Sequence, residues 1–282
     1  MFDVYSHSRR VPVGDLEIAV TDHGSAEDKP VLLIHGFPDS ARLWRHQIPA
    51  LTDAGYRAIA PDLRGLGRSG RPKGVDGYKL STVASDMIAV MDEAGIDRAH
   101  VVGHDWGAAT AWFLAISAPQ RVRSLVALSV GHPSAFQNAG RRQVEKSWYM
   151  LLFQFEGVAE TWLSREDWRG LREWTGSHPE IEHWIEDLSR PEALTAALDH
   201  YRANSGPKRF LAPPLRLPAV EVPCLGVWSS GDVALTEEQM TDSQTYVEGE
   251  WRYERLDDAS HWIPVDAPDR LNSLLLEWLR AH

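Results

Sequence analysis

Residues 99–115 have the sequence AHVV-GHDWG-AATAWFLA. The apolar run 99–102 is typical of a strand and the run 108–115 of a helix, so the glycine-flanked residues 103–107 form a strand-to-helix junction. Such a junction is typical of a nucleophile elbow, in which a strained turn lifts one side chain above the sheet beside a helix N-terminus. That side chain is Asp105, and a carboxylate there indicates attack on an sp³ carbon with a covalent alkyl-ester intermediate. An ordinary turn with a helix-capping aspartate is the structural alternative.

Composition places limits on the class of protein. The chain has 282 residues, 43% hydrophobic and 24% charged, which is typical of a soluble globular protein. A net charge of -11 argues against a nucleic-acid partner. We expect a cytoplasmic protein, because no apolar run resembles a signal peptide or a membrane span. Cys224 is expected to be a buried apolar residue, and we expect no metal or other cofactor.

Strand-like and helix-like segments alternate along most of the chain. The predicted strands are 16–20, 31–34, 57–60, 99–102, 122–130, 224–228 and 251–256, and the predicted helices include 41–54, 80–94 and 266–279. This order predicts an α/β fold with a mostly parallel central sheet and helices on both faces. Leu16–Val20 alternates as if one face met water, whereas Val31–Ile34 is apolar throughout. Ser81 is a plausible N-cap for the second helix.

A long segment without a convincing strand interrupts this alternation. Residues 131–218 are helix-like and rich in tryptophan, which predicts a helical cap inserted between core segments 1–130 and 219–282. Five tryptophans between residues 148 and 184 are expected to pack in a core or to line an apolar pocket. Gly65, Gly67 and Gly70 form a G-x-G-x-x-G pattern, but a loop and not a helix follows them, so we reject nucleotide binding.

Three reactive side chains follow predicted strands in the order nucleophile, acid and histidine, namely Asp105, Asp232 and His261. The carboxyl ends of parallel strands share one edge, and this order is that of the α/β-hydrolase fold. Asp232 has an alternative role as cap of a helix near Thr236, and His261 as a structural histidine. The loop beginning at His35 is predicted to supply backbone N–H groups to an oxyanion hole, with His35 itself structural. His132 receives no role.

Beyond this order, the chain resembles the soluble epoxide hydrolases of the α/β-hydrolase superfamily essentially from end to end. The similar segments are HGFP at 35–38, DLRGLGRS at 62–69, GHDWG at 103–107, WYMLLFQFEGVAE at 148–160 and LDHYRAN at 198–204. The last two are the most discriminating, because the family's two ring-opening tyrosines lie in segments similar to them. The resemblance implies a reaction that turns an apolar epoxide and water into a vicinal diol.

The resemblance also implies a role for each site residue. Two tyrosines hold the oxygen of the opening epoxide while the elbow carboxylate attacks a carbon. The histidine, oriented by the second aspartate, then activates the water that hydrolyses the ester. The implied residues are the catalytic Asp105, Asp232, His261, Tyr149 and Tyr201, with the backbone N–H groups of Phe37 and Trp106 as the oxyanion hole.

Two other functions remain open at this point. A haloalkane dehalogenase shares the aspartate and the histidine, and the Trp106 indole suits a leaving halide, but Phe37 stands where that family often has a second halide donor. Fluoroacetate dehalogenases fit less well, because they place an arginine after the nucleophile. A non-catalytic binding protein on the same fold is the third alternative. The oligomeric state, monomer or homodimer, is also open.

Overall fold

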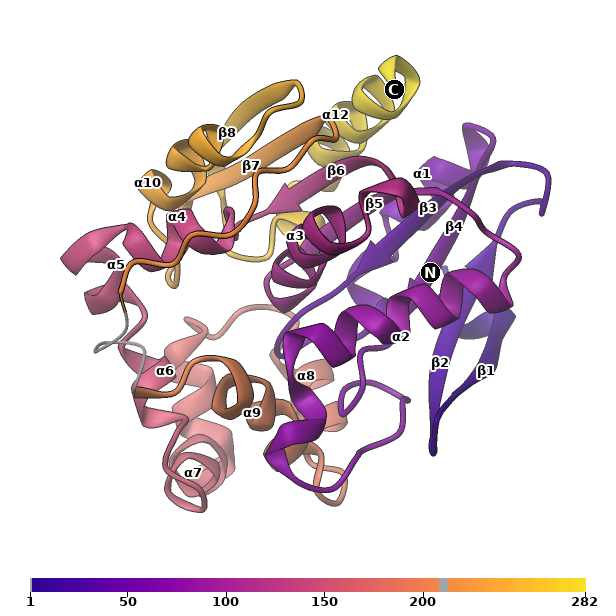
Figure 1. The fold of residues 1–282 in the computed structure, drawn as a ribbon. Coiled ribbons are helices and arrows are strands. Elements are labelled where there is room, and N and C mark those ends of the chain that lie inside the picture. Colours follow the sequence, from indigo (N-terminus) through magenta and orange to yellow (C-terminus); the bar gives the residue numbers. More distant parts are fainter. Residues whose placement is uncertain (1, 208–212) are drawn as a thin grey trace.

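The computed structural model describes residues 2–207 and 213–282. Its centre is an eight-stranded sheet with the strand order β1-β2-β4-β3-β5-β6-β7-β8 (Figure 1). Only the β1–β2 and β2–β4 pairs are antiparallel. The strands are β1 Ser8–Val13, β2 Leu16–His23, β3 Lys29–Ile34, β4 Tyr56–Pro61, β5 Ala99–His104, β6 Val122–Leu128, β7 Cys224–Gly231 and β8 Trp251–Ser260.

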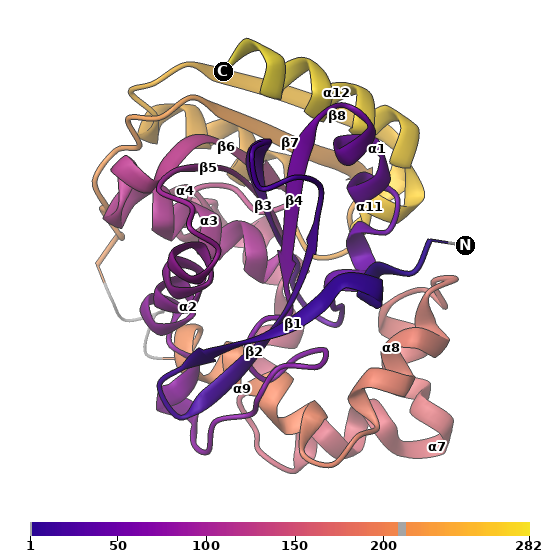
Figure 2. The same ribbon diagram turned by 90° about the vertical axis from the view of Figure 1, so that its right-hand side faces the viewer.

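Helices cover both faces of the sheet, as predicted. Two views a quarter turn apart place α2 and α3 on one face and α1 and α12 on the other (Figures 1 and 2). The core helices are α1 Gln47–Asp53, α2 Leu80–Glu93, α3 Trp106–Ser117, α10 Glu237–Thr241, α11 Ile263–Asp266 and α12 Pro268–Ala281. Every residue of β5 is buried between these layers, which explains why the central strands are apolar without alternation.

A helical region lies between β6 and β7. Its helices are α4 Pro133–Asn138, α5 Gly140–Lys146, α6 Trp148–Leu152, α7 Val158–Trp174, α8 Ile181–Leu188 and α9 Ala193–Asn204, with α7 interrupted at residues 165–168. The part of this region that the structure describes contains no strand, only an isolated bridge at Val220. The helical insertion is thus confirmed. Its predicted bounds, 131 and 218, enclose residues 208–212, which lie outside the described residues.

Local details differ from the predictions. Strand β1 was not predicted, and the prediction that one face of β2 meets water is wrong, because Ile18 to Thr21 are all buried. The 3-10 turn Val4–His7 packs against β2, as does α2. The predicted helix 41–54 is divided into a 3-10 turn, Ala41–Trp44, and α1. Pro49 lacks an N–H and fits only a first helical turn, so the helix begins just before it.

The start of α2 also differs from the prediction. The N-cap is Lys79 and not Ser81, and the N–H of Leu80 donates instead to Asn204 Oδ1 at 2.8 Å. An acceptor from α9 therefore serves the free N–H at the start of α2, a long-range contact that no local pattern in the sequence could indicate.

Candidate active site

The elbow has the strained geometry that the sequence predicts. Asp105 has φ 54° and ψ -121° between the end of β5 and the start of α3. A Cβ on Gly103 would lie 2.3 Å from the Gly107 carbonyl oxygen, and one on Gly107 only 1.9 Å from that of Ile34, so both positions require glycine. The Asp105 side chain does not cap α3, and the helix-capping alternative is therefore wrong.

The three predicted reactive side chains meet at one edge of the sheet. Asp232 directly follows β7 and His261 directly follows β8. The Nδ1 of His261 lies 2.8 Å from Asp232 Oδ2, and its Nε2 lies 3.6 Å from Asp105 Oδ2. All three side chains are buried. A histidine placed between two carboxylates in this way can accept protons from, and donate protons to, a group bound at Asp105.

Hydrogen bonds fix the acid in one orientation. Asp232 Oδ1 accepts from the N–H groups of Ala234 and Leu235 at 2.8 and 2.9 Å, which leaves Oδ2 for His261. The N-cap of α10 is Thr236, so the alternative role of Asp232 as the cap of that helix is wrong.

The backbone of His261 is fixed in turn. Its carbonyl oxygen lies 2.8 Å from His104 Nε2 and accepts from Ser129 Oγ at 3.0 Å. His261 is therefore held at its backbone by His104 and Ser129 and at its ring by Asp232.

Asp105 and His261 shift each other's pKa values in the directions that keep both side chains charged. Burial alone would raise the pKa of Asp105, but the hydrogen bond and charge of His261 outweigh it, together with the Phe37 N–H, and the pKa is lowered. Burial likewise opposes protonation of His261, yet Asp232 and Asp105 together raise its pKa to about 10. In the resting site Asp105 is ionised and His261 carries a proton.

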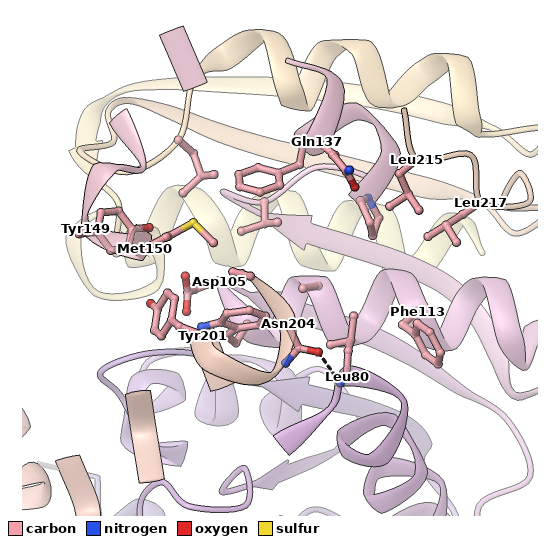
Figure 3. Close-up of a pocket in the computed structure, with 17 residues that line it drawn as sticks. Leu80, Asp105, Phe113, Gln137, Tyr149, Met150, Tyr201, Asn204, Leu215 and Leu217 are labelled. Atoms are coloured by element: carbon pink, nitrogen blue, oxygen red, sulfur yellow. Dashed lines mark hydrogen bonds between the residues drawn. The ribbon is translucent and has the colours of Figure 1, made fainter. Parts of the chain in front are cut away.

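Two predicted tyrosines line the same cavity as the nucleophile. Tyr149 lies on α6 and Tyr201 on α9, both buried, with ring centroids 6.0 Å apart. They border a cavity of about 290 Å³ together with Asp105, and both labelled rings lie beside the aspartate in Figure 3. Burial, followed by the nearby charge of Asp105, raises the pKa of Tyr201 well above its usual value. Its phenol therefore keeps its proton and can donate a hydrogen bond.

Backbone donors surround the carboxylate. The N–H of Phe37 donates to Asp105 Oδ1 at 2.7 Å, and Trp106 begins α3, whose first N–H groups have no acceptor within the helix. A Cβ on Gly36 would lie 2.3 Å from Asp105 Oδ1 and 2.6 Å from the Trp106 nitrogen. Only glycine allows the loop to approach so closely.

Most of the cavity wall was not identifiable from the sequence. Core packing is confirmed for four of the five clustered tryptophans, since Trp184 is buried and Trp162, Trp168 and Trp174 pack against the core. Trp148 is exposed, and none of the five borders this cavity. Its apolar lining includes Leu80, Phe113, Val130, Phe136, Met150, Leu215 and Leu217. Trp106 also borders it, and its indole lies edge-on to the Tyr201 ring, with the ring centroids 5.0 Å apart, and interacts with the Tyr201 phenol.

The remaining histidine and cysteine predictions concern structural positions. His35 Nε2 accepts from the Leu63 N–H at 2.9 Å, which leaves Nδ1 to donate to the Gly36 carbonyl, so the structural role of His35 is confirmed. His132 caps α4. Cys224 is buried and unpaired.

The described residues contain no group of three or more His, Cys, Asp or Glu side chains placed to hold a metal ion. No helix in the described part of the chain has both the length and the apolar character that a bilayer span requires.

Comparisons with known proteins identify the fold and the family. The family model of the alpha/beta hydrolase fold matches residues 29–268. The chain is 34% identical to the AB hydrolase superfamily protein YfhM of Bacillus subtilis, over 90% of this chain and 91% of that protein. It is 30% identical to epoxide hydrolase A of Mycobacterium tuberculosis, over 96% of each chain. A solved epoxide hydrolase from hot-environment metagenomes superimposes with a TM-score of 0.87 at 28% identity, over the full length of both chains. The chain belongs to the epoxide hydrolase family of the α/β-hydrolase fold.

Proposed function

We propose that this protein hydrolyses an apolar epoxide to a vicinal diol. The observation that carries the proposal is the pair of buried phenols, Tyr149 and Tyr201, on the cavity that contains Asp105. The leaving group of an opening epoxide is an alkoxide tethered to the substrate, and it leaves readily only if its oxygen is hydrogen-bonded or protonated. Phenols that keep their protons supply that hydrogen bond, as Tyr201 can.

The first step of the proposed reaction forms an ester. The Asp105 carboxylate attacks one epoxide carbon, the carbon–oxygen bond breaks, and a tyrosine transfers its proton to the departing oxygen. The product is a β-hydroxyalkyl ester of Asp105 and a tyrosinate, which recovers its proton from the protonated His261 before the second step.

The second step hydrolyses that ester. His261 takes a proton from water, the resulting hydroxide adds to the ester carbonyl carbon, and the N–H groups of Phe37 and Trp106 hold the oxyanion. Collapse releases the diol and restores the Asp105 carboxylate, which now contains the oxygen of the water. Diol from one turnover in ¹⁸O-labelled water is therefore expected to contain no label.

Ester formation itself prepares the base. In the resting site Asp105 helps to raise the pKa of His261 to about 10, which keeps the ring protonated. Alkylation removes that negative charge and the hydrogen bond with it, so only Asp232 still favours the proton. His261 can then give its proton to the tyrosinate and become neutral at the stage when a base is needed.

Cavity chemistry supports an apolar substrate. Besides the catalytic groups, the polar side chains on the cavity wall are Gln137, Asn204 and Ser205. The Asn204 amide is already occupied by hydrogen bonds to Leu80, Tyr78 and His200. A small epoxide with an apolar substituent therefore fits this wall best.

One observation favours a second candidate, a haloalkane dehalogenase. The Trp106 indole borders the cavity beside Asp105, where its Nε1 can donate to a halide in place of the Tyr201 phenol. The ester and its hydrolysis would be the same in that reaction, and only the leaving group differs. The phenol pair is the reason to place the epoxide first.

Product analysis separates the candidates. The protein is incubated with styrene oxide, 1-chlorobutane and a p-nitrophenyl ester, and diol, halide and phenol are measured. Diol alone is expected; halide alone would replace the proposal with the dehalogenase, and no product from any substrate would support a binding protein. Intact-mass spectrometry of His261→Gln should show a stable adduct of one substrate mass, and Asp105→Asn, the matched control, should show none.

A further inference from the structure

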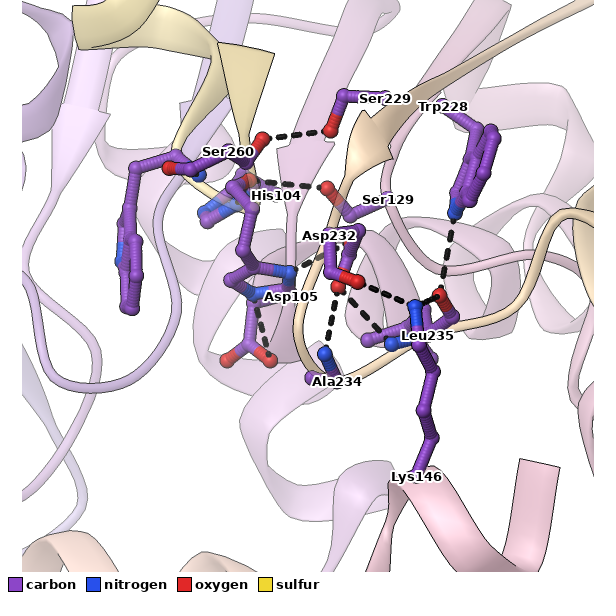
Figure 4. Close-up of polar contacts among 12 residues, drawn as sticks. His104, Asp105, Ser129, Lys146, Trp228, Ser229, Asp232, Ala234, Leu235 and Ser260 are labelled. Atoms are coloured by element: carbon purple, nitrogen blue, oxygen red, sulfur yellow. Dashed lines mark hydrogen bonds and ion pairs between the residues drawn. The ribbon is translucent and has the colours of Figure 1, made fainter. Parts of the chain in front are cut away.

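The loop that carries the triad acid is held from outside the sheet. Lys146, at the end of α5, donates from Nζ to the carbonyl oxygens of both Asp232 and Leu235, the latter at 2.9 Å. These two carbonyls bracket the turn whose N–H groups bind the Asp232 carboxylate. Figure 4 shows the Lys146 side chain reaching this turn from the neighbouring helix.

A second side chain of α5 holds the same loop. The Gln143 amide, which is buried, accepts from the Thr236 N–H at 2.9 Å and donates to the Ala234 carbonyl oxygen at 3.0 Å. Together, Gln143 and Lys146 satisfy backbone groups at four of the five positions 232–236, leaving out only residue 233. We call this contact the α5 clamp, meaning Gln143 and Lys146 bound to the acid loop 232–236.

Among the described residues, the Lys146 ammonium makes its hydrogen bonds to the loop and not to a carboxylate. Other charged residues of α5 form surface ion pairs, such as Arg141 with Glu145 at 2.6 Å and Arg142 with Glu238 at 2.6 Å. Lys146, by contrast, has no carboxylate within ion-pair distance in the described part of the chain. A half-buried ammonium bound to two carbonyl oxygens orders the backbone around it, because charge-assisted hydrogen bonds are the stronger ones.

We propose that Lys146, assisted by Gln143, is a positioning residue that orients Asp232 toward His261 from the helical insertion. Lys146 lies three residues before Tyr149, on the chain that continues into α6. The same short segment therefore places one phenol over the nucleophile and fixes the acid of the triad. This inference rests on the proposed function for its kinetic consequences, but not for its structural ones.

Loss of the clamp should slow ester hydrolysis more than ester formation. Ester formation needs the Asp105 carboxylate and the phenols, whereas ester hydrolysis needs His261 held in place by Asp232. In Lys146→Met we expect ester hydrolysis to slow by about tenfold, since small displacements of catalytic groups have effects of this size or larger. Ester formation should change by less than about twofold. Arg141→Met, on the same helix and equal in charge change, should leave both rates unchanged.

A titration of His261 tests the clamp without any turnover. The ring faces Asp105, Asp232 and His104, and its NMR signal is identified by its absence in His261→Gln. Loosening Asp232 removes a stabilising partner, so positioning predicts a lower His261 midpoint in Lys146→Met. A purely electrostatic effect of the lost positive charge predicts a higher one.

These measurements distinguish failure of the clamp proposal from failure of the proposed function. A lowered midpoint in Lys146→Met, unchanged in Arg141→Met, supports the clamp even if no epoxide is turned over. An unchanged or raised midpoint, or equal hydrolysis rates in the two variants, overturns it even if the wild type makes diol. Should Lys146→Met not fold, Lys146→Gln removes the same charge and gives the same comparison.

Discussion

The coupling between nucleophile and histidine can be tested by removing one charge. Asp105→Asn keeps the side-chain shape but not the negative charge, and so imitates the esterified state. The atoms Asp105 Oδ2 and His261 Nε2 are 3.6 Å apart. At an effective dielectric constant near 20, two unit charges at that distance interact by about 4.6 kcal/mol, or roughly three decades in a proton equilibrium.

We therefore expect the His261 titration midpoint to fall by one to about three pH units in Asp105→Asn, the upper figure being the full Coulomb value. The assay is an NMR titration of ¹³C-labelled histidine, with the intact mass confirming that the amide persists. Asp39→Asn is the control, because Asp39 is a buried carboxylate that binds Trp184 Nε1 at 3.0 Å and not His261.

A His261 midpoint that stays within half a pH unit, about 0.7 kcal/mol, would refute the reasoning. It would mean that Asp232 alone sets the charge of His261 and that ester formation does not free the base. A fall in both variants would also count against it, because the effect would then not depend on the Asp105 contact.

Three further outcomes follow from the site. Tyr201→Phe should slow ester formation by about 10- to 150-fold, which corresponds to the free energy of one charge-assisted hydrogen bond. The control Tyr78→Phe removes a buried phenol that donates to a loop carbonyl and should leave the rate unchanged. Rapid-mixing tryptophan fluorescence measures both rates. Gly36→Ala should cut ester formation at least about tenfold by displacing Asp105, since its Cβ would lie 2.3 Å from Oδ1, and the same fluorescence signal reports it. Because the folded pKa of His261 is raised from 6.5 to about 10, its stabilisation is complete below pH 6.5 and is lost as pH rises to about 10; urea unfolding of the wild type and His261→Gln should converge over that range.

The sheet and the reactive groups could be predicted from the sequence, because each rests on a local pattern. Buried parallel strands are apolar without alternation, and their carboxyl ends share an edge, so Asp105, Asp232 and His261 could be expected to meet. The helical insertion was visible as a break in the same alternation.

Features that depend on distant contacts could not be predicted. The burial of β2, the capping of α2 by Asn204 and the clamp made by Lys146 all join segments that are far apart in the chain. Lys146 looks like an ordinary solvent-facing residue of a charged helix until α5 is placed beside the acid loop. Tyr149 and Tyr201 were identified by family resemblance only, since tyrosine in a helical segment is more often a packing residue.

The glycines at either end of the elbow have a consequence for how such a protein can change over generations. Gly103 and Gly107 fix the path of the chain so tightly that the backbone tolerates no side chain at either position. Position 105 between them is directed by this path whatever its side chain. A single replacement there can therefore exchange one reaction for another while the fold stays the same. The backbone fixes where the reactive side chain lies, and selection can act on which side chain it is.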